Sequence, residues 1–131
     1  MINVAVVGCG YWGPNLIRNF IVNQEINLLW VCDLDTQRLG AVASNYPTVK
    51  KTTRLSDILN DPNVEGVALA TPVSTHYTLA EQCLKSGKHV LMEKPFVSTS
   101  DQAKRLLALA KKQQLQILCD HTFCYTGAVK K

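Results

Sequence analysis

Three of the seven glycines fall within six positions, in the segment "VVGCGYWGPN", directly after an apolar run. Gly8, Gly10 and Gly13 have the spacing G-x-G-x-x-G, which is typical of dinucleotide binding where a strand passes into a helix. In that setting Gly8 permits a tight turn, Gly10 lets a diphosphate approach the backbone, and Gly13 lets the helix lie close to the strand. Pro14 suits a first helical turn, whose free N–H groups face an anion. The alternative is a tight turn that binds no ligand.

An acidic residue follows at the distance that a dinucleotide site needs. Asp33 ends the second apolar run, "INLLWVCD", about 20 residues after Gly13. Its carboxylate can accept hydrogen bonds from both hydroxyls of an adenosine ribose, and it would repel the 2′-phosphate of NADP. The pattern therefore favours NAD over NADP. Arg38, in the helix that follows, leaves NADP open, and a surface acid at a strand end is the alternative for Asp33.

The fourth apolar run ends in "ATPVSTHY", residues 70–77. In a dinucleotide-binding sheet the cleft opens between the carboxyl ends of the first and fourth strands. Ala70, Thr71 and Pro72 are therefore expected to form the wall of the cleft opposite the glycines. His76, one helical turn further on, could point into the cleft; a surface or capping histidine is the alternative.

The fifth apolar run ends in "MEKPF", residues 92–96. Glu93 and Lys94 should face the same cleft, with the backbone fixed by Pro95. A lysine beside a nicotinamide could hydrogen-bond a substrate hydroxyl or help to move its proton. On these residues alone, a surface lysine is the more common interpretation.

The elements that must position these residues alternate along the chain. Apolar runs of strand length are separated by segments whose apolar residues recur at helical spacing. The second helix is expected to begin at Asp35, the third at Ser56 and the fourth at Ser74 or Thr75, with Gly87 left-handed after the fourth. The strict alternation predicts a doubly wound parallel sheet, a Rossmann fold with three layers, α/β/α.

Composition limits the function classes. The 131 residues correspond to one domain, and the net charge of +4 comes from scattered basic pairs without interleaved aromatics, so no nucleic acid partner is expected. No apolar run approaches the roughly 20 residues of a membrane span, and no secretory signal is visible, so a cytoplasmic location is expected. Five scattered cysteines indicate reduced thiols. "CDHTFC", residues 119–124, lacks a fourth ligand, and no metal is expected there.

Four motifs in this order and spacing, "GCGYWGPN", "VCDLD", "ATPVSTHY" and "EKPF", resemble the Gfo/Idh/MocA family of sugar oxidoreductases. The resemblance spans essentially all of residues 1–120, and the Glu-Lys-Pro at 93–95 is its most distinctive part. The ending "HTFCYTGAVKK", together with "GYWGPN", looks most like members that oxidise nucleotide-linked sugars, such as UDP-N-acetylglucosamine 3-dehydrogenases.

The resemblance implies hydride transfer between a nicotinamide cofactor, NAD, and a hydroxyl of a sugar or nucleotide sugar. It implies that Lys94 is catalytic and contacts both nicotinamide and substrate, with Glu93 on the nicotinamide side. Tyr11 and Trp12 would offer backbone amides near the phosphates. Besides the glycines and Asp33, the residues expected to border the cofactor are Tyr11, Trp12, Arg38, Ala70, Thr71, Pro72, His76, Glu93 and Lys94.

Members of the family are considerably longer, and their second domain supplies most sugar contacts and usually the oligomer interface. The sequence accordingly predicts a dinucleotide-binding Rossmann domain at residues 1–120 and, at 121–131, the start of a connection to a substrate domain. We expect a fragment that binds dinucleotide but hardly turns over, from an enzyme that is a homo-oligomer. Two rivals stay open: a freestanding nucleotide-binding sensor without catalysis, and a methyltransferase that binds S-adenosylmethionine.

Overall fold

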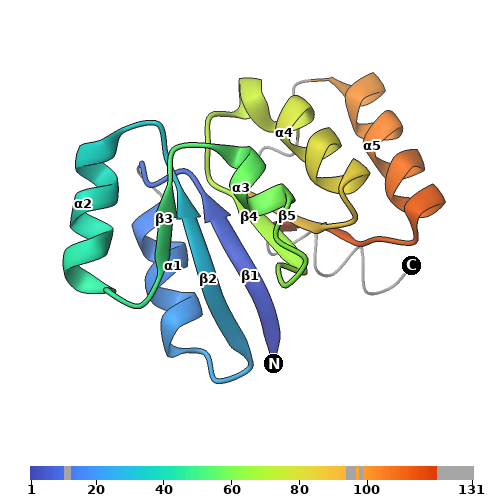
Figure 1. The fold of residues 1–131 in the computed structure, drawn as a ribbon. Helices are drawn as coiled ribbons and strands as arrows, with labels where there is room; N and C mark the ends of the chain where they lie inside the picture. Colours follow the sequence, from blue (N-terminus) through green and yellow to red (C-terminus); the bar gives the residue numbers. More distant parts are fainter. Residues whose placement is uncertain (11–12, 94–96, 98, 121–131) are drawn as a thin grey trace.

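The computed structural model describes residues 1–10, 13–93, 97 and 99–120, except for the side chains of residues 93, 119 and 120. Strands and helices alternate throughout this part of the chain, in the order expected from the sequence (Figure 1). They are β1 (Ile2–Val7), α1 (Gly13–Val22), β2 (Ile26–Cys32), α2 (Thr36–Asn45), β3 (Lys50–Thr52), α3 (Leu55–Leu59), β4 (Gly66–Leu69), α4 (Val73–Lys85), β5 (His89–Glu93), α5 (Ser100–Gln113) and β6 (Ile117–Asp120).

The strands form one sheet in the order β3-β2-β1-β4-β5-β6. Every neighbouring pair is parallel, and β1 lies between β2 and β4. The chain therefore runs outward from β1 to β3, returns to β4, and runs outward again to β6. Because parallel crossovers are right-handed, reversing direction at β1 sends the helices of the two halves to opposite faces. This is the doubly wound Rossmann fold that the sequence predicts.

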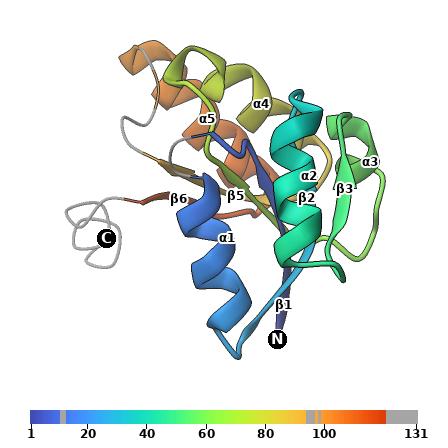
Figure 2. The ribbon, with the colours of Figure 1, turned by 90° about the vertical axis from the view of Figure 1, so that its left-hand side faces the viewer.

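Each face of the sheet has its own apolar core (Figures 1 and 2). Val6 packs on the side of α1 and α2, whereas its neighbours Ala5 and Val7 pack on the side of α3, α4 and α5. Where alternate residues of a strand enter two cores, both faces must be apolar, which explains the unbroken apolar run Val4–Val7 in β1. Turning the molecule brings α1 and α2 in front of the strands (Figure 2).

Helix starts agree with the sequence in part. Asp35 caps α2 by accepting hydrogen bonds from the N–H groups of Gln37 and Arg38, and Gly87 has a φ of +83° after α4, as predicted. Ser56 was the wrong start, because α3 begins at Leu55 and contains it. Ser74 and Thr75 were also wrong, because α4 begins at Val73.

These two helices begin without a side-chain cap. The residue before α4 is Pro72, whose ring fixes a φ suited to the approach to a helix. The residue before α3 is Arg54, whose N–H bonds the hydroxyl of Thr52 3.0 Å away. The hydroxyls of Thr52 and Thr75 bind nearby backbone groups and cap neither helix.

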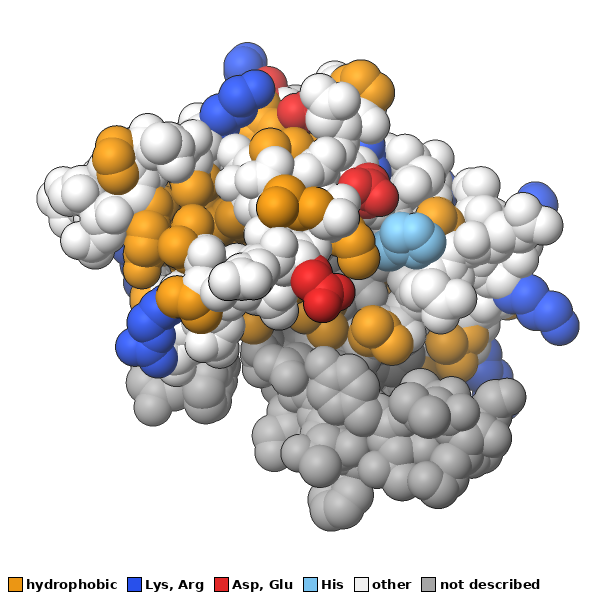
Figure 3. All heavy atoms as spheres, turned by 90° about the horizontal axis from the view of Figure 1, so that it is seen from below, with side chains coloured by type: hydrophobic (Ala, Val, Ile, Leu, Met, Phe, Trp, Pro, Cys, Tyr) orange, Lys and Arg blue, Asp and Glu red, His pale blue; other side chains and the backbone are white. Residues whose placement is uncertain are grey.

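The amino ends of the strands lie on the face shown in Figure 3. The Lys and Arg side chains drawn there lie apart, around the edge of that face. Within the part of the chain that the structure describes, no helix has the length and apolar character of a membrane span. The described side chains also form no group of three or more His, Cys, Asp or Glu suited to a metal ion. The side chain of Cys119 and all of His121 lie outside this description.

Candidate functional site

The turn after β1 requires glycine at its first position. Gly8 has a φ of +102°, a conformation that side chains disfavour. A Cβ on Gly8 would also lie 2.8 Å from the carbonyl oxygen of Ala70 and 2.9 Å from Cγ2 of Thr71. The Gly8 N–H donates to the carbonyl of Cys32, 2.7 Å away. The turn at the carboxyl end of β1 is therefore held between the ends of β2 and β4, next to the place predicted for the cleft, between β1 and β4.

The other two glycines differ in what surrounds them. A Cβ on Gly13 would lie 2.1 Å from the carbonyl oxygen of Gly8, so α1 can begin this close to the turn only without a side chain. A Cβ on Gly10 would meet one described atom within 4 Å, Nη1 of Arg38 at 3.4 Å. Gly13 is thus required by packing. Among the described residues, only the flexible end of Arg38 lies near Gly10, which suits a backbone that receives a phosphate.

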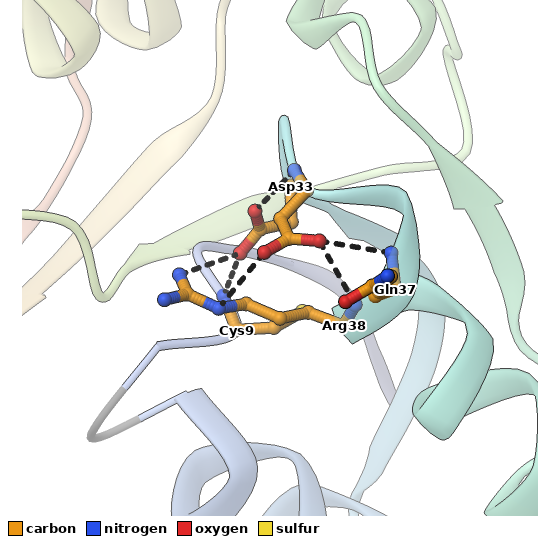
Figure 4. A network of polar contacts seen from close by, with 5 residues as sticks. Cys9, Asp33, Gln37 and Arg38 are labelled. Carbon is orange, nitrogen blue, oxygen red and sulfur yellow. Dashed lines mark hydrogen bonds and ion pairs between the residues drawn. The ribbon is translucent and has the colours of Figure 1, made fainter.

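Asp33 points toward this glycine turn (Figure 4). Its Oδ2 accepts a hydrogen bond from the Cys9 N–H at 2.6 Å, and its Oδ1 accepts one from the Asp35 N–H at 2.7 Å. The side chain is 9% exposed. Two backbone donors on different oxygens therefore fix the orientation of the carboxylate beside the glycine turn.

Arg38, a residue of α2, extends its side chain toward Asp33 and Asp35, beside the glycine turn (Figure 4). We call this group of charged residues and the glycine turn the corner. Nη1 of Arg38 is 3.9 Å from Oδ2 of Asp33, and its Nε is 3.6 Å from Oδ2 of Asp35. The side chain is 54% exposed. A half-exposed ion pair at these distances contributes little to stability, so the guanidinium is held only loosely.

The β4–α4 connection forms the wall opposite the glycines. The Ala70 N–H donates to the carbonyl of Val7 at 2.8 Å. The Thr75 hydroxyl lies 2.7 Å from the Thr71 hydroxyl and 2.6 Å from the carbonyl of Pro72. These contacts fix Ala70, Thr71 and Pro72 beside Gly8, where the sequence analysis expected them.

His76 lies behind this wall. It is 1% exposed, and its Nε2 is 2.9 Å from the carbonyl oxygen of Thr71. The ring therefore supports the backbone of the wall from within the fold. Its expected place at the cofactor stays a prediction.

The sequence analysis missed two contributors. One is the backbone N–H of Cys9, which orients Asp33; its only signal is its place between the first two glycines. The other is the Thr75 hydroxyl, which was considered only as a helix start. Tyr11, Trp12 and Lys94 lie outside the described residues, as does the side chain of Glu93, so their expected roles stay predictions.

Burial suppresses the reactivity of the cysteines near the site. It raises the pKa of the Cys9 thiol to about 12, with a further increase from the neighbouring Asp33 carboxylate. Burial and Asp33 likewise raise the pKa of the Cys32 thiol to about 11. Because the thiolate is the nucleophile, neither side chain is suited to covalent chemistry at neutral pH.

We expect both thiols to escape alkylation in the folded protein. With a pKa near 12, roughly one Cys9 thiol in ten thousand is ionised at pH 8, and raising the pH increases that fraction. Treatment with iodoacetamide at pH 8, followed by peptide mass spectrometry, should leave Cys9 and Cys32 unmodified until urea unfolds the chain. Rapid labelling of Cys9 in the folded state would contradict the burial of its thiol.

Comparison with known proteins gives the same assignment as the geometry. The family model described as "Oxidoreductase family, NAD-binding Rossmann fold" (GFO_IDH_MocA) matches residues 2–121. The chain belongs to the Gfo/Idh/MocA oxidoreductase family. Its described part is an NAD-binding domain of that family, with the sheet order and the glycine turn predicted from the sequence.

Among Gfo/Idh/MocA relatives, inositol 2-dehydrogenase of Rubrobacter xylanophilus is 36% identical over 107 residues, 81% of this chain and 30% of the relative. The scyllo-inositol 2-dehydrogenase (NADP(+)) IolW of Bacillus subtilis is 33% identical over 86 residues, 66% of this chain and 24% of the relative. The crystal structure of GenD2 from gentamicin A biosynthesis, in complex with NAD, superposes with a TM-score of 0.86 at 32% identity. That superposition covers 90% of this chain and 34% of GenD2. The chain thus spans about a third or less of the length of these relatives.

Proposed function

We propose that this NAD-binding domain serves a dehydrogenase that acts on a hydroxyl of a sugar, a nucleotide sugar or a related ring polyol. The relatives named for inositol support this substrate class, because inositols are ring polyols like sugars. Lys94 is proposed as the catalytic residue, and the domain boundary near residue 120 is part of the same proposal. The binding half of the proposal depends on one observation, the fixed carboxylate of Asp33 beside the glycine turn.

The residues at the corner fit a dinucleotide. A diphosphate needs close approach to the backbone, and among the described atoms only Nη1 of Arg38 lies within 4 Å of a Cβ on Gly10. The start of α1 supplies free N–H groups. Asp33 has lone pairs left on both oxygens after accepting from Cys9 and Asp35, so it can also accept from ribose hydroxyls. Thr71 and Pro72 would border the dinucleotide from the other side.

NAD bound here would supply the hydride acceptor for a carbinol carbon, which becomes a carbonyl carbon. The chain must then take the hydroxyl proton, and an amine at the carboxyl end of β5 is suited to that task. Lys94 directly follows β5, whose backbone pairs with β4 beside the glycine turn. The sequence position of Lys94, directly after a strand that pairs with β4, supports proposing it for the role.

Substitution of Gly10 tests the binding site without disturbing the fold. In Gly10→Val the added Cβ meets one described atom within 4 Å, at the flexible end of Arg38, so we expect the free energy of unfolding to change by less than about 0.5 kcal/mol. Calorimetric titration should show NADH binding to the wild-type chain and at least about thirtyfold weaker binding to the variant. Equal NADH affinity in Gly10→Val, or preference of the wild type for S-adenosylmethionine, would refute the proposal.

The catalytic half needs the substrate-binding part of the enzyme as well. In such a full-length enzyme, Lys94→Ala should lower kcat for the alcohol substrate by at least about a hundredfold, the scale of a lost proton-transfer group. The dissociation constant of NADH should stay within about threefold of the wild-type value. An unchanged kcat would remove Lys94 from the catalytic role.

A further inference from the structure

We propose that Thr75 is a positioning residue of the dinucleotide site. Its hydroxyl accepts the hydrogen bond of the Thr71 hydroxyl, so that Thr71 meets the nicotinamide half of the coenzyme only as a hydrogen-bond acceptor. The inference rests on the proposed binding of a dinucleotide at the glycine turn. It adds to that proposal the hydrogen-bond polarity of the wall opposite the glycines, and the residue of α4 that sets this polarity.

Three contacts hold Thr71 in one conformation. Its carbonyl accepts a hydrogen bond from Nε2 of the buried His76 at 2.9 Å. Its methyl carbon, Cγ2, faces the glycine turn, 2.9 Å from the place of a Cβ on Gly8. Its hydroxyl lies 2.7 Å from that of Thr75, in the first turn of α4. The Thr71 hydroxyl therefore has a fixed place just after β4, on a residue that is only partly buried.

The protons of the two hydroxyls determine which one donates. Oγ1 of Thr75 lies 2.6 Å from the carbonyl oxygen of Pro72, and a carbonyl has no proton, so Thr75 donates in this bond. A hydroxyl carries a single proton, which this bond uses. The contact of 2.7 Å between the two hydroxyls therefore carries the proton of Thr71, which donates to Oγ1 of Thr75. Thr71 keeps its lone pairs and has no proton left for a ligand.

The place of Thr71 decides which part of the coenzyme meets these lone pairs. Asp33 after β2 would bind the adenosine ribose, and the glycine turn after β1 would bind the diphosphate, so the remaining half extends toward the end of β4. The ribose hydroxyls and the carboxamide NH₂ of that half are donors. Diphosphate oxygens only accept, and the lone pairs of Thr71 repel them. The acceptor at Thr71 therefore sets the position of the coenzyme along the wall.

Thr75 also supports the start of α4, and substitution can separate the two roles. Its N–H donates to the Pro72 carbonyl at 2.9 Å, a bond that valine keeps. Thr75→Val therefore retains a side chain of similar shape and the backbone bond, and it removes only the hydroxyl. The Thr71 hydroxyl then has no acceptor in α4 and can turn, so its lone pairs no longer point in one direction.

The experiment is a double-mutant cycle with two ligands. NADH, and ADP as a ligand without the nicotinamide half, are titrated by calorimetry into the wild type, Thr75→Val, Thr71→Val and the double variant. Thr75→Ser keeps the hydroxyl. Thr78→Val makes the same change at an exposed position of the same helix and is the matched control. Urea unfolding of each variant shows that it is folded during the titration.

Thr75→Val should weaken NADH binding about three- to tenfold, the scale of one neutral hydrogen bond, and change ADP binding less than about twofold. Thr71→Val should weaken NADH binding by a similar factor. Adding Thr75→Val to it should cause less than about twofold further loss, because Thr75 acts through the Thr71 hydroxyl. Thr75→Ser and Thr78→Val should bind both ligands as the wild type does.

Three results would overturn this inference and leave the proposed function in place. They are unchanged NADH binding in Thr75→Val, losses that add in the double variant, and equal weakening of ADP and NADH, which would indicate a purely structural role. A wild-type chain that binds neither ligand would overturn the proposed function and this inference together.

Discussion

Gly13→Ala is expected to destabilise the domain by at least about 3 kcal/mol, the upper range for overpacking a close-packed site. The added Cβ would lie 2.1 Å from the carbonyl oxygen of Gly8 and 2.9 Å from its carbonyl carbon. Both are backbone atoms and cannot rotate away, so α1 must move from β1 or the turn must reopen. Either change also displaces the N–H groups proposed to face the diphosphate, and NADH binding should be lost with the stability. Urea unfolding followed by circular dichroism measures the effect.

Gly40→Ala is the matched control for this substitution. Gly40 lies in α2, where an added Cβ meets no described atom within 4 Å outside its chain neighbours and the helix's own backbone, and its φ is not in the left-handed region. Alanine in a helix interior is favoured over glycine, so this variant should gain about 0.5–1 kcal/mol. If Gly13→Ala were as stable as the wild type while Gly40→Ala behaved as expected, the close approach of α1 to the glycine turn would be wrong.

The sequence predicted the structure best at positions where the backbone geometry permits only one type of residue. At Gly8 and Gly13 a side chain collides with backbone, so the motif spacing predicts the turn and the start of α1 together. The alternating faces of β1 likewise require an unbroken apolar run, which made the strand visible. The strand order followed from the alternation of elements, because right-handed crossovers leave few arrangements of such a chain.

The sequence was less informative where several residues can meet the same need. A helix start can be capped by serine, threonine or aspartate, or can follow a proline, so Ser56 and Thr75 were plausible and wrong. His76 was predicted to face the cleft from helical spacing alone. The buried ring donates a hydrogen bond from Nε2 to the Thr71 carbonyl, a contact that no local pattern reveals.

The position of Arg38 shows the same limit within the site itself. The sequence places Arg38 in the first turn of α2, but two preceding aspartates, Asp33 and Asp35, set the direction of its side chain. The sequence raised it only as a reason to keep NADP open. The structure adds that Asp33 is held by backbone N–H groups without help from the arginine, which separates the roles of the two side chains.

Asp33→Asn should have the largest effect on binding among substitutions that preserve side-chain volume. An asparagine has one acceptor oxygen, so it can keep the bond from the N–H of Cys9 or from that of Asp35, but not both. The side-chain NH₂ group then faces one of these two backbone N–H groups, and two donors cannot bond each other, so the turn loosens. The negative charge that would bind the ribose hydroxyls is also lost. Loss of charge-assisted hydrogen bonds of this kind costs about 1.5–3 kcal/mol, so the NADH dissociation constant should rise about ten- to hundredfold.

Asp35→Asn separates this role from a general effect of charge. Asp35 lies two residues further on and caps α2, a position where asparagine serves as well as aspartate. The variant therefore removes the same charge from the same loop while keeping its hydrogen bonds, and its NADH affinity should stay within about threefold of the wild type. If both variants weakened NADH binding equally, loop charge rather than the fixed carboxylate would explain the affinity. If neither variant weakened NADH binding, the ribose would have to bind elsewhere, and the proposed dinucleotide site at the glycine turn would be wrong.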